Sequence, residues 1–433
     1  MKLNYKRTIL VGFAFMSISA FWQLYDTTIP VMLKNSFQMN DFYAGFIMAI
    51  DNVLALFLLP FFGALSDKRN TKIGKRMPFI IGGTIAATIL MVVLPIFDQS
   101  QNLFWYCVTL GLLLFAMGTY RSPAVALMPD VTPKPLRSKA NAIINLMGTV
   151  GGLFSLGMIR LLVQNITEDQ RNIGVRENYQ GVYIAVALFM LLAVLILFIT
   201  IKERKIGKEL AAQGGLQEEE LQQAVGEERL SPAVKKSMIL ILASVFFWFM
   251  GYNAVTTSFS KYVMGVWGKG IGDASACLMV ATVGATIAFL PVGMLSSKFG
   301  RKRMIQFGVT LLALCFGAGS LVGEFSKGLY GLFALVGVAW ACINVNSYPM
   351  VVELGQGATV GKYTGYYYTF SMAAQIVTPI LSGFLLENVG YHTLFPYAAI
   401  MVAISFVTIS LTKHGDNKPP KPGTLEAFAA GEE

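Results

Sequence analysis

Long apolar stretches recur along the whole chain of 433 residues. A helix needs about 20 apolar residues to cross a hydrocarbon layer of roughly 30 Å, and each stretch is long enough for that. The pattern therefore predicts twelve transmembrane helices, with approximate limits 8–33, 42–66, 78–97, 103–128, 139–163, 180–201, 237–262, 274–296, 304–324, 329–352, 363–386 and 392–412. The first stretch is too long for a signal-peptide core and no small-residue cleavage pattern follows it, so we expect it in the mature protein.

The largest break in this pattern is a polar stretch between Lys202 and Lys236, which divides the predicted helices six and six. We expect an N-terminal bundle over 1–201, a linker over 202–236, a C-terminal bundle over 237–412 and a tail over 413–433. Only 13% of the residues are charged and 55% are hydrophobic, whereas a soluble domain carries about 25% charged residues. This composition excludes a soluble enzyme.

The net charge of +10 raises the question of nucleic-acid binding, but the placement of the charges answers it. Of the 34 Lys and Arg residues, 26 fall in alternate loops and termini, and 6 fall on the other side. An excess of Lys and Arg marks the cytoplasmic side of a membrane protein. We therefore expect a multi-pass protein of the cell membrane with both termini, the linker and the tail in the cytoplasm, and no nucleic-acid partner.

The two halves share a sequence pattern. Gly63 opens a loop motif with Asp67 and Arg76 between the second and third helices, and Gly293 opens its copy 230 residues later. Pro123 in the fourth helix has a counterpart, Pro349, at an offset of 226. Two matches at nearly one offset indicate a duplicated unit of six helices. Parallel repeats about an axis along the membrane normal are the architecture of the major facilitator fold.

Further motifs carry a more specific resemblance. They are Asp51-Asn52, the loop from Gly63 to Arg76 with Pro78, Tyr120 to Pro123 with Pro129-Asp130, Trp248 to Asn253, Asn346 to Pro349, and Lys362 to Tyr368. Together they resemble the glycoside-pentoside-hexuronide cation symporter family of the major facilitator superfamily, and within it the bacterial sucrose-transporter-like branch related to solute carrier family 45. The resemblance covers nearly all of the helical chain.

The resemblance implies a secondary active symporter for a sugar or glycoside that works by alternating access, with the first, fourth, seventh and tenth helices around a central cavity. The chain departs from the family in two places. A sodium-binding carboxylate pair of melibiose-permease relatives corresponds here to Ala55 and Leu59, and an acidic residue of the closer branch corresponds to Thr256. A drug or metabolite efflux antiporter and a transporter-fold solute receptor remain alternatives. The fifth helix lacks the Gly-Pro typical of drug antiporters, and the linker is short for a receptor.

Two charged residues lie inside predicted helices near the centre of the membrane, where a charge costs about 2.5–3.5 kcal/mol. These residues are Asp51 and Arg121. In one interpretation Asp51 alternates between a proton, the solute and Arg121 and so couples transport to an ion gradient; in the other, the two form a fixed structural pair. Sodium needs several oxygen ligands in one cage, and Asp51 has only the Asn52 amide beside it. We therefore favour the proton over sodium.

Aromatic and polar residues at helical spacing form the candidate solute site. An aromatic ring packs on the C–H face of a sugar, and carboxylates and amides bond its hydroxyl groups. The candidates are Trp22, Asp26, Trp248, Tyr252, Asn253, Thr256, Trp340, Asn344, Tyr348 and Gln375. Aromatic stripes at this spacing also arise from ordinary packing, so both interpretations stay open.

By resemblance, the conformational latch consists of Gly63, Asp67, Lys68, Lys75 and Arg76, with plain cytoplasmic anchoring as the alternative. The two histidines, His392 and His414, are far apart and have no cluster of Cys or carboxylates at ligand spacing. We expect no metal, no cofactor and a monomer.

Overall fold

The computed structural model of the protein describes residues 3–69, 71–133, 136–166, 170, 175–212, 231–352, 354 and 360–416. Within these ranges twelve helices are long and apolar enough to cross a membrane, which confirms the prediction of twelve spans in an all-helical membrane protein. The centre of the predicted linker, 213–230, and the tail from 417 onward lie outside the described residues.

Most of the helices extend a few residues beyond the predicted limits, whereas the fifth, sixth, ninth and twelfth spans end before them. The first half contains α1 (Tyr5–Asn35), α2 (Asp41–Lys68), α3 (Met77–Gln99), α4 (Leu103–Asp130), α5 (Arg137–Leu162) and α7 (Gln180–Thr200). The short helix α8 (Glu203–Ala212) opens the linker. The second half contains α9 (Pro232–Val266), α10 (Ile271–Phe299), α11 (Arg301–Ser320), α12 (Gly328–Val352), α13 (Val360–Asn388), the 3-10 turn η3 (Tyr391–Thr393) and α14 (Leu394–Ser410).

Two compact units divide the chain. The first comprises Met1–Gly215 with Ser260–Met279, and the second comprises Leu216–Phe259 with Val280–Glu433. The last turns of α9 and the first turns of α10 thus belong with the first unit. The limits predicted for the two bundles, which follow whole helices, stay a prediction.

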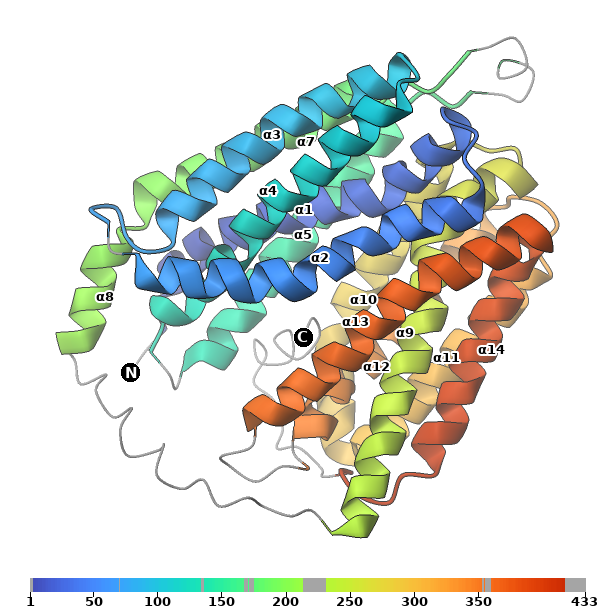
Figure 1. Ribbon diagram of the computed structural model, residues 1–433. Helices are drawn as coiled ribbons and strands as arrows, with labels where there is room; N and C mark the ends of the chain where they lie inside the picture. Colours follow the sequence, from blue (N-terminus) through green and yellow to red (C-terminus); the bar gives the residue numbers. More distant parts are fainter. Residues whose placement is uncertain are drawn as a thin grey trace. The chain divides into compact units, whose positions relative to one another are not determined.

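In the first unit α1 packs against α5, α7 and α4, and α3 packs against α4 and α7 (Figure 1). Glycine lets α1 and α5 approach closely, because a Cβ atom at Gly151 would lie 1.9 Å from the Met16 carbonyl oxygen. Helices within a membrane associate through such close packing of small residues. The core of this unit is therefore built around α1.

In the second unit α11 packs against α12 and α14, and α12 packs against α13. A close approach of the same kind joins α12 to α10, since a Cβ atom at Gly337 would lie 2.0 Å from the Ala281 carbonyl oxygen. Buried Met304 of α11 and Cys342 and Val345 of α12 lie in one hydrophobic cluster with residues of α10.

Candidate functional site

Four candidate residues of the first unit gather around α1. Trp22 and Asp26 lie one turn apart on α1, Asp51 lies on α2, and Arg121 lies on α4. The Arg121 guanidinium carbon is 5.3 Å from the centre of the Trp22 ring, a cation–π distance. Asp26 and Asp51 are within electrostatic range of each other and of Arg121. The fold thus brings residues from three helices into one charged group, which we call the α1 charge group.

Asp51 is half-buried, and its carboxylate is hydrogen-bonded by the next residue of α2. Its Oδ1 accepts from the Asn52 backbone N–H at 2.6 Å and from Asn52 Nδ2 at 2.8 Å. These two bonds fix the direction of the carboxylate. With Asp26 and Arg121 nearby, the group combines two acids and one base in the middle of helices that span the membrane, where charges are costly.

Two buried polar groups next to this charge group have no hydrogen-bond partner among the described residues. They are Trp22 Nε1 and Tyr25 Oη. Their rings lie 5.5 Å apart at an interplanar angle of 81°. Buried donors are nearly always paired, so each exception calls for an explanation. The sequence analysis did not include Tyr25, although its position between Trp22 and Asp26 on one helix was a usable signal.

In the second unit the structure joins two of the candidate aromatic residues directly. The rings of Tyr252 on α9 and Trp340 on α12 are stacked, with centroids 3.7 Å apart and an interplanar angle of 7°. Phe249 meets the Trp340 ring edge-on, with the centroids 5.3 Å apart. One face of the Trp340 ring is therefore covered by Tyr252.

Unpaired donors recur beside this stack. Trp248 Nε1 and Asn253 Nδ2 are buried without a partner among the described residues. Trp248 has no exposed surface, and Asn344 on α12 is 9% exposed. The second unit thus repeats the combination of aromatic rings and unpaired donors that the first unit shows around Trp22.

Other candidates are bonded within the protein. Tyr348 Oη lies 3.0 Å from Thr364 Oγ1 and ties α12 to α13. Gln375 Nε2 donates to the Ser371 carbonyl at 3.4 Å. The Thr256 hydroxyl donates to the Asn253 carbonyl of its own helix at 3.3 Å.

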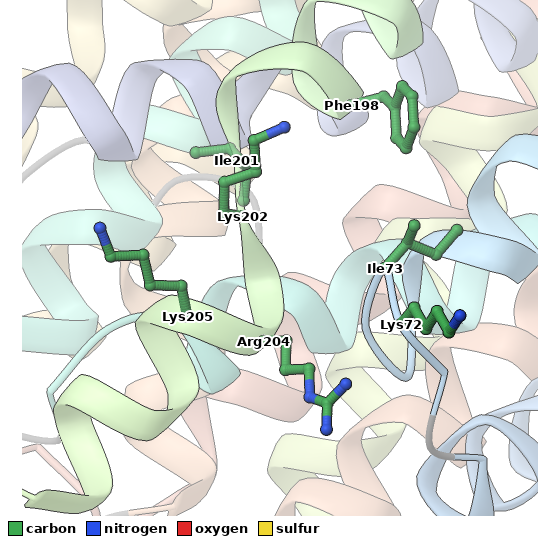
Figure 2. Close-up of a pocket in the computed structure, with 7 residues that line it drawn as sticks. All are labelled: Lys72, Ile73, Phe198, Ile201, Lys202, Arg204 and Lys205. Carbon is green, nitrogen blue, oxygen red and sulfur yellow. The ribbon is translucent and has the colours of Figure 1, made fainter.

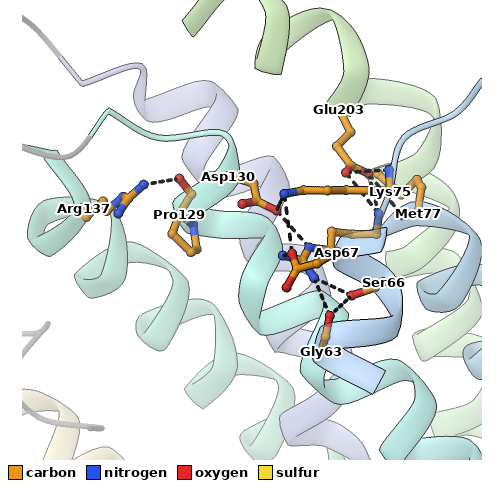
Figure 3. A network of polar contacts seen from close by, with 10 residues as sticks. Gly63, Ser66, Asp67, Lys75, Met77, Pro129, Asp130, Arg137 and Glu203 are labelled. Carbon is orange, nitrogen blue, oxygen red and sulfur yellow. Dashed lines mark hydrogen bonds and ion pairs between the residues drawn. The ribbon is translucent and has the colours of Figure 1, made fainter. Parts of the chain in front are cut away.

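The loop between α2 and α3 carries a dense ionic cluster centred on Arg76 (Figure 3). The Arg76 side chain is 5% exposed, and its Nε donates to Asp130 Oδ2 at 2.9 Å. Its two terminal nitrogens donate to Asp67 and to the Gly63 carbonyl and Ser66 hydroxyl. Lys75 Nζ lies 3.2 Å from Asp130 Oδ2.

Of the predicted latch residues, Gly63 and Asp67 thus each contact Arg76, whereas Lys68 is exposed at the end of α2. Lys75, in the same loop, supplies the second cation. Asp130 at the end of α4 completes the cluster. In the sequence, the motif Pro129-Asp130 of the family resemblance was the signal that could have pointed to it. The cluster ties α2, the loop and α4 together.

A buried glutamate that the sequence analysis did not single out caps α3. Glu203, the first residue of α8, accepts from the backbone N–H groups of Lys75, Arg76 and Met77 at 2.9–3.1 Å. The first N–H groups of a helix have no partner within it, and a carboxylate there also meets the positive end of the helix dipole. Gly74 is required beside it, because its φ is +126° and a Cβ atom would lie 2.1 Å from Glu203 Oε2.

The second half repeats this arrangement. Gly300, which lies 226 residues after Gly74, has a φ of +93° and directly precedes α11. Asp416, shortly after α14, accepts from the Lys302 backbone N–H at 2.9 Å. A Cβ atom at Gly300 would lie 2.8 Å from Asp416 Oδ1. In each half an acid that follows the sixth spanning helix caps the third one, so the internal repeat extends to the polar contacts.

A second ionic group of the first unit lies at the start of α2. Asp41 is fully buried; its Oδ1 accepts from Lys261 Nζ at 2.7 Å, and its Oδ2 lies 3.0 Å from Lys34 Nζ. Lys261 belongs to the segment of α9 that clusters with this unit. Within the described ranges, no three His, Cys, Asp or Glu side chains are placed to hold a metal ion.

The chain is similar in sequence to several known proteins. The multidrug resistance protein MdtG of Enterobacter lignolyticus is 21% identical over 422 residues, which cover 95% of this chain and 93% of that protein. The sucrose transport protein SUC3 of Arabidopsis thaliana is 26% identical over 136 residues, 27% of this chain and 23% of that protein. For other curated relatives the chain spans only 44% or 30% of their length.

A solved structure of the nucleoside transporter NupG has a TM-score of 0.69 at 14% identity and covers 94% of this chain and 100% of its own. At this identity the likeness concerns the fold. The sequence profile described as Major Facilitator Superfamily matches residues 11–270 and 262–431. These two ranges take in nearly the whole sequence, and the chain therefore belongs to the Major Facilitator Superfamily of secondary transporters.

Proposed function

We propose that this transporter is a proton-coupled symporter for a sugar or glycoside. The observation that carries the proposal is a set of buried donors beside aromatic rings that have no partner in the described part of the chain. They are Trp22 Nε1 and Tyr25 Oη in one half, and Trp248 Nε1 and Asn253 Nδ2 in the other. A sugar offers many hydroxyl oxygens as acceptors and C–H faces that pack on aromatic rings. Within either half, a solute bound beside the rings would offer acceptors to the donors of that half, whose burial is otherwise costly.

The α1 charge group supports the proton as the coupling ion. Without a proton, the Asp51 carboxylate is stabilised by the positive charge of Arg121; with one, it no longer attracts Arg121. A proton on Asp51 would leave Asp26 as the remaining acid within range of Arg121. The weaker attraction between α2 and α4 would shift the balance between inward-open and outward-open states. In this proposal the protein works as a monomer in the cell membrane with both termini in the cytoplasm.

Uptake into proteoliposomes that contain the purified full chain tests the proposal. A panel of radiolabelled sugars is offered under an imposed proton gradient or an imposed sodium gradient. We expect accumulation of at least one sugar that follows the proton gradient. Uptake that depends on sodium and not on pH would refute the coupling.

Two variants sharpen this test. Asp51→Asn should abolish accumulation driven by the gradient but retain exchange at equal pH, because the neutral amide resembles the protonated acid. Glu324→Gln, which removes an acid at an exposed position, serves as the matched control and should accumulate sugar normally. An Asp51→Asn variant that still concentrates sugar would exclude Asp51 as the coupling residue.

Efflux is the second candidate, and one observation favours it. The relative whose match extends over 95% of this chain bears the name of a multidrug resistance protein. An efflux antiporter would expel a lipophilic cation such as ethidium from energised cells. Ethidium efflux that requires Asp51, together with no sugar accumulation in the proteoliposomes, would replace the first proposal with this one.

A further inference from the structure

A basic cavity of about 680 Å³ lies beside the capped start of α3, at the junction of α7 and α8. Lys72 and Ile73 of the α2–α3 loop form one side, and the end of α7 with the first residues of α8 forms the other (Figure 2). The volume is that of a typical small-molecule site. The cavity is separate from the α1 charge group and from the aromatic residues of the proposed solute site.

Four of the residues that line the cavity are cationic: Lys72, Lys202, Arg204 and Lys205. The acid in their midst, Glu203, is 5% exposed, and its carboxylate is bonded to the backbone at the start of α3. Among the described residues that line the cavity, the positive charge therefore has no acid to offset it. In Figure 2 the cationic side chains point in different directions and do not converge on one point, so the lining does not form a compact site for a single small ion.

The remaining lining is apolar and continues onto the face of α7 that meets lipid. Phe198 is 37% exposed and Ile73 is 40% exposed, and both line the cavity. Leu195 and Ile199, in the last turns of α7, are 52% and 59% exposed. On a helix that spans a membrane, exposed apolar side chains face hydrocarbon. An acyl chain lying along this stripe would place its headgroup at the basic residues.

We propose that this cavity binds the headgroup of an anionic phospholipid from the cytoplasmic leaflet, with one acyl chain along α7. The predicted topology puts the α2–α3 loop and the linker in the cytoplasm, where basic pockets beside spanning helices recognise anionic headgroups. The bound lipid would bridge the two segments that Glu203 already joins, the loop before α3 and the start of α8. It would thereby stabilise the contact between Glu203 and α3.

Native mass spectrometry of the purified full chain, titrated with phosphatidylglycerol or with phosphatidylcholine of the same acyl chains, tests the proposal. We expect preferential retention of phosphatidylglycerol. The triple variant Lys72→Gln, Lys202→Gln, Lys205→Gln should lose about fivefold in affinity per charge and on the order of 100-fold in total. Its binding of phosphatidylcholine should not change.

A matched triple variant provides the control. Lys6→Gln, Lys235→Gln and Lys236→Gln remove three exposed lysines of the predicted cytoplasmic side that lie outside the cavity, and this variant should bind phosphatidylglycerol as the unmodified chain does. Equal losses in both triple variants would overturn the proposal, because they would show general attraction to the basic face. The single variant Lys205→Gln, with an expected loss of about fivefold, keeps the test decisive if the cavity triple variant does not fold.

Competition by soluble anions separates a lipid from a free phosphate compound. Glycerol 3-phosphate and inorganic phosphate lack acyl chains and should not displace phosphatidylglycerol at equal concentration. Phe198→Ala should weaken phosphatidylglycerol binding, since the ring forms part of the apolar lining of the cavity. Displacement by either soluble anion at equal concentration would assign the cavity to a soluble phosphate compound and refute the lipid. Full binding by Phe198→Ala would overturn the placement of the acyl chain along α7.

Discussion

Removing the carboxylate of Glu203, the buried first residue of α8, should loosen the start of α3. In Glu203→Ala the N–H groups of Lys75, Arg76 and Met77 lose their acceptor. Hydrogen bonds to a charged group contribute about 1.5–3 kcal/mol each, which gives an upper limit of about 4.5–9 kcal/mol for three. Loss of an ordinary helix cap costs about 0.5–2 kcal/mol.

The expected loss lies between these limits because water can reach part of the vacated site. We expect the free energy of local opening to fall by about 3 kcal/mol, which corresponds to roughly 100-fold faster exchange of the amide hydrogens. Hydrogen exchange of the peptide that covers Lys75 to Ile80, measured by mass spectrometry on the purified protein, reports this directly. Glu203→Gln keeps one carbonyl oxygen as acceptor but loses the charge, so its exchange should accelerate by roughly 10-fold.

Glu324→Ala is the matched control, since Glu324 is exposed in the loop after α11. It should leave the exchange of this peptide unchanged. If Glu203→Ala exchanged at the rate of the unmodified protein, or if Glu324→Ala accelerated exchange as strongly, the carboxylate would not be the cap of α3.

Three further substitutions test other contacts. Gly74→Ala should destabilise the loop before α3 by about 1–3 kcal/mol, because φ is +126° there and a Cβ atom would meet the capping carboxylate; hydrogen exchange of the loop measures this, and unchanged exchange would contradict it. Asp41→Asn should lower the free energy of unfolding by about 3–5 kcal/mol, because it leaves the buried cation Lys261 without its carboxylate. Denaturant titration in detergent measures this, and equal midpoints for the variant and the unmodified protein would contradict it. Gly151→Ala should lower the free energy of unfolding by about 1–3 kcal/mol in the same titration, since its Cβ would lie 1.9 Å from the backbone of α1. Gly157→Ala on the same helix meets nothing within 4 Å and should be neutral. Equal effects of the two variants would refute the close approach of α1 and α5.

The sequence alone determined the number of spanning helices and the internal repeat. In a membrane every backbone polar group must be bonded within its own segment, so an apolar stretch of sufficient length becomes a helix whatever its neighbours are. The repeat was visible because Gly63 and Gly293 open similar loops. The structure extends it to the positive φ of Gly74 and Gly300, which only a residue without a side chain adopts readily.

From the sequence, the candidate site residues could be assigned only to individual helices. Helical spacing placed Trp22 and Asp26 on one face, and the cost of an intramembrane charge singled out Asp51 and Arg121. Spacing within a helix cannot say which faces of different helices meet. The approach of Arg121 to the Trp22 ring follows from how α1 and α4 pack.

Only the tertiary structure decided which loop residues form the ionic cluster. Lys68 and Lys75 both follow Asp67 closely, but Lys68 ends α2 facing outward, and the turn at Gly74 brings Lys75 back to Asp67 and Asp130. Glu203 lies 128 residues from Lys75 in sequence, and nothing near it in the chain marks it as a cap. A helix leaves its first N–H groups unpaired whatever its sequence is, and the packing of distant segments determines which acid comes close enough to bond them.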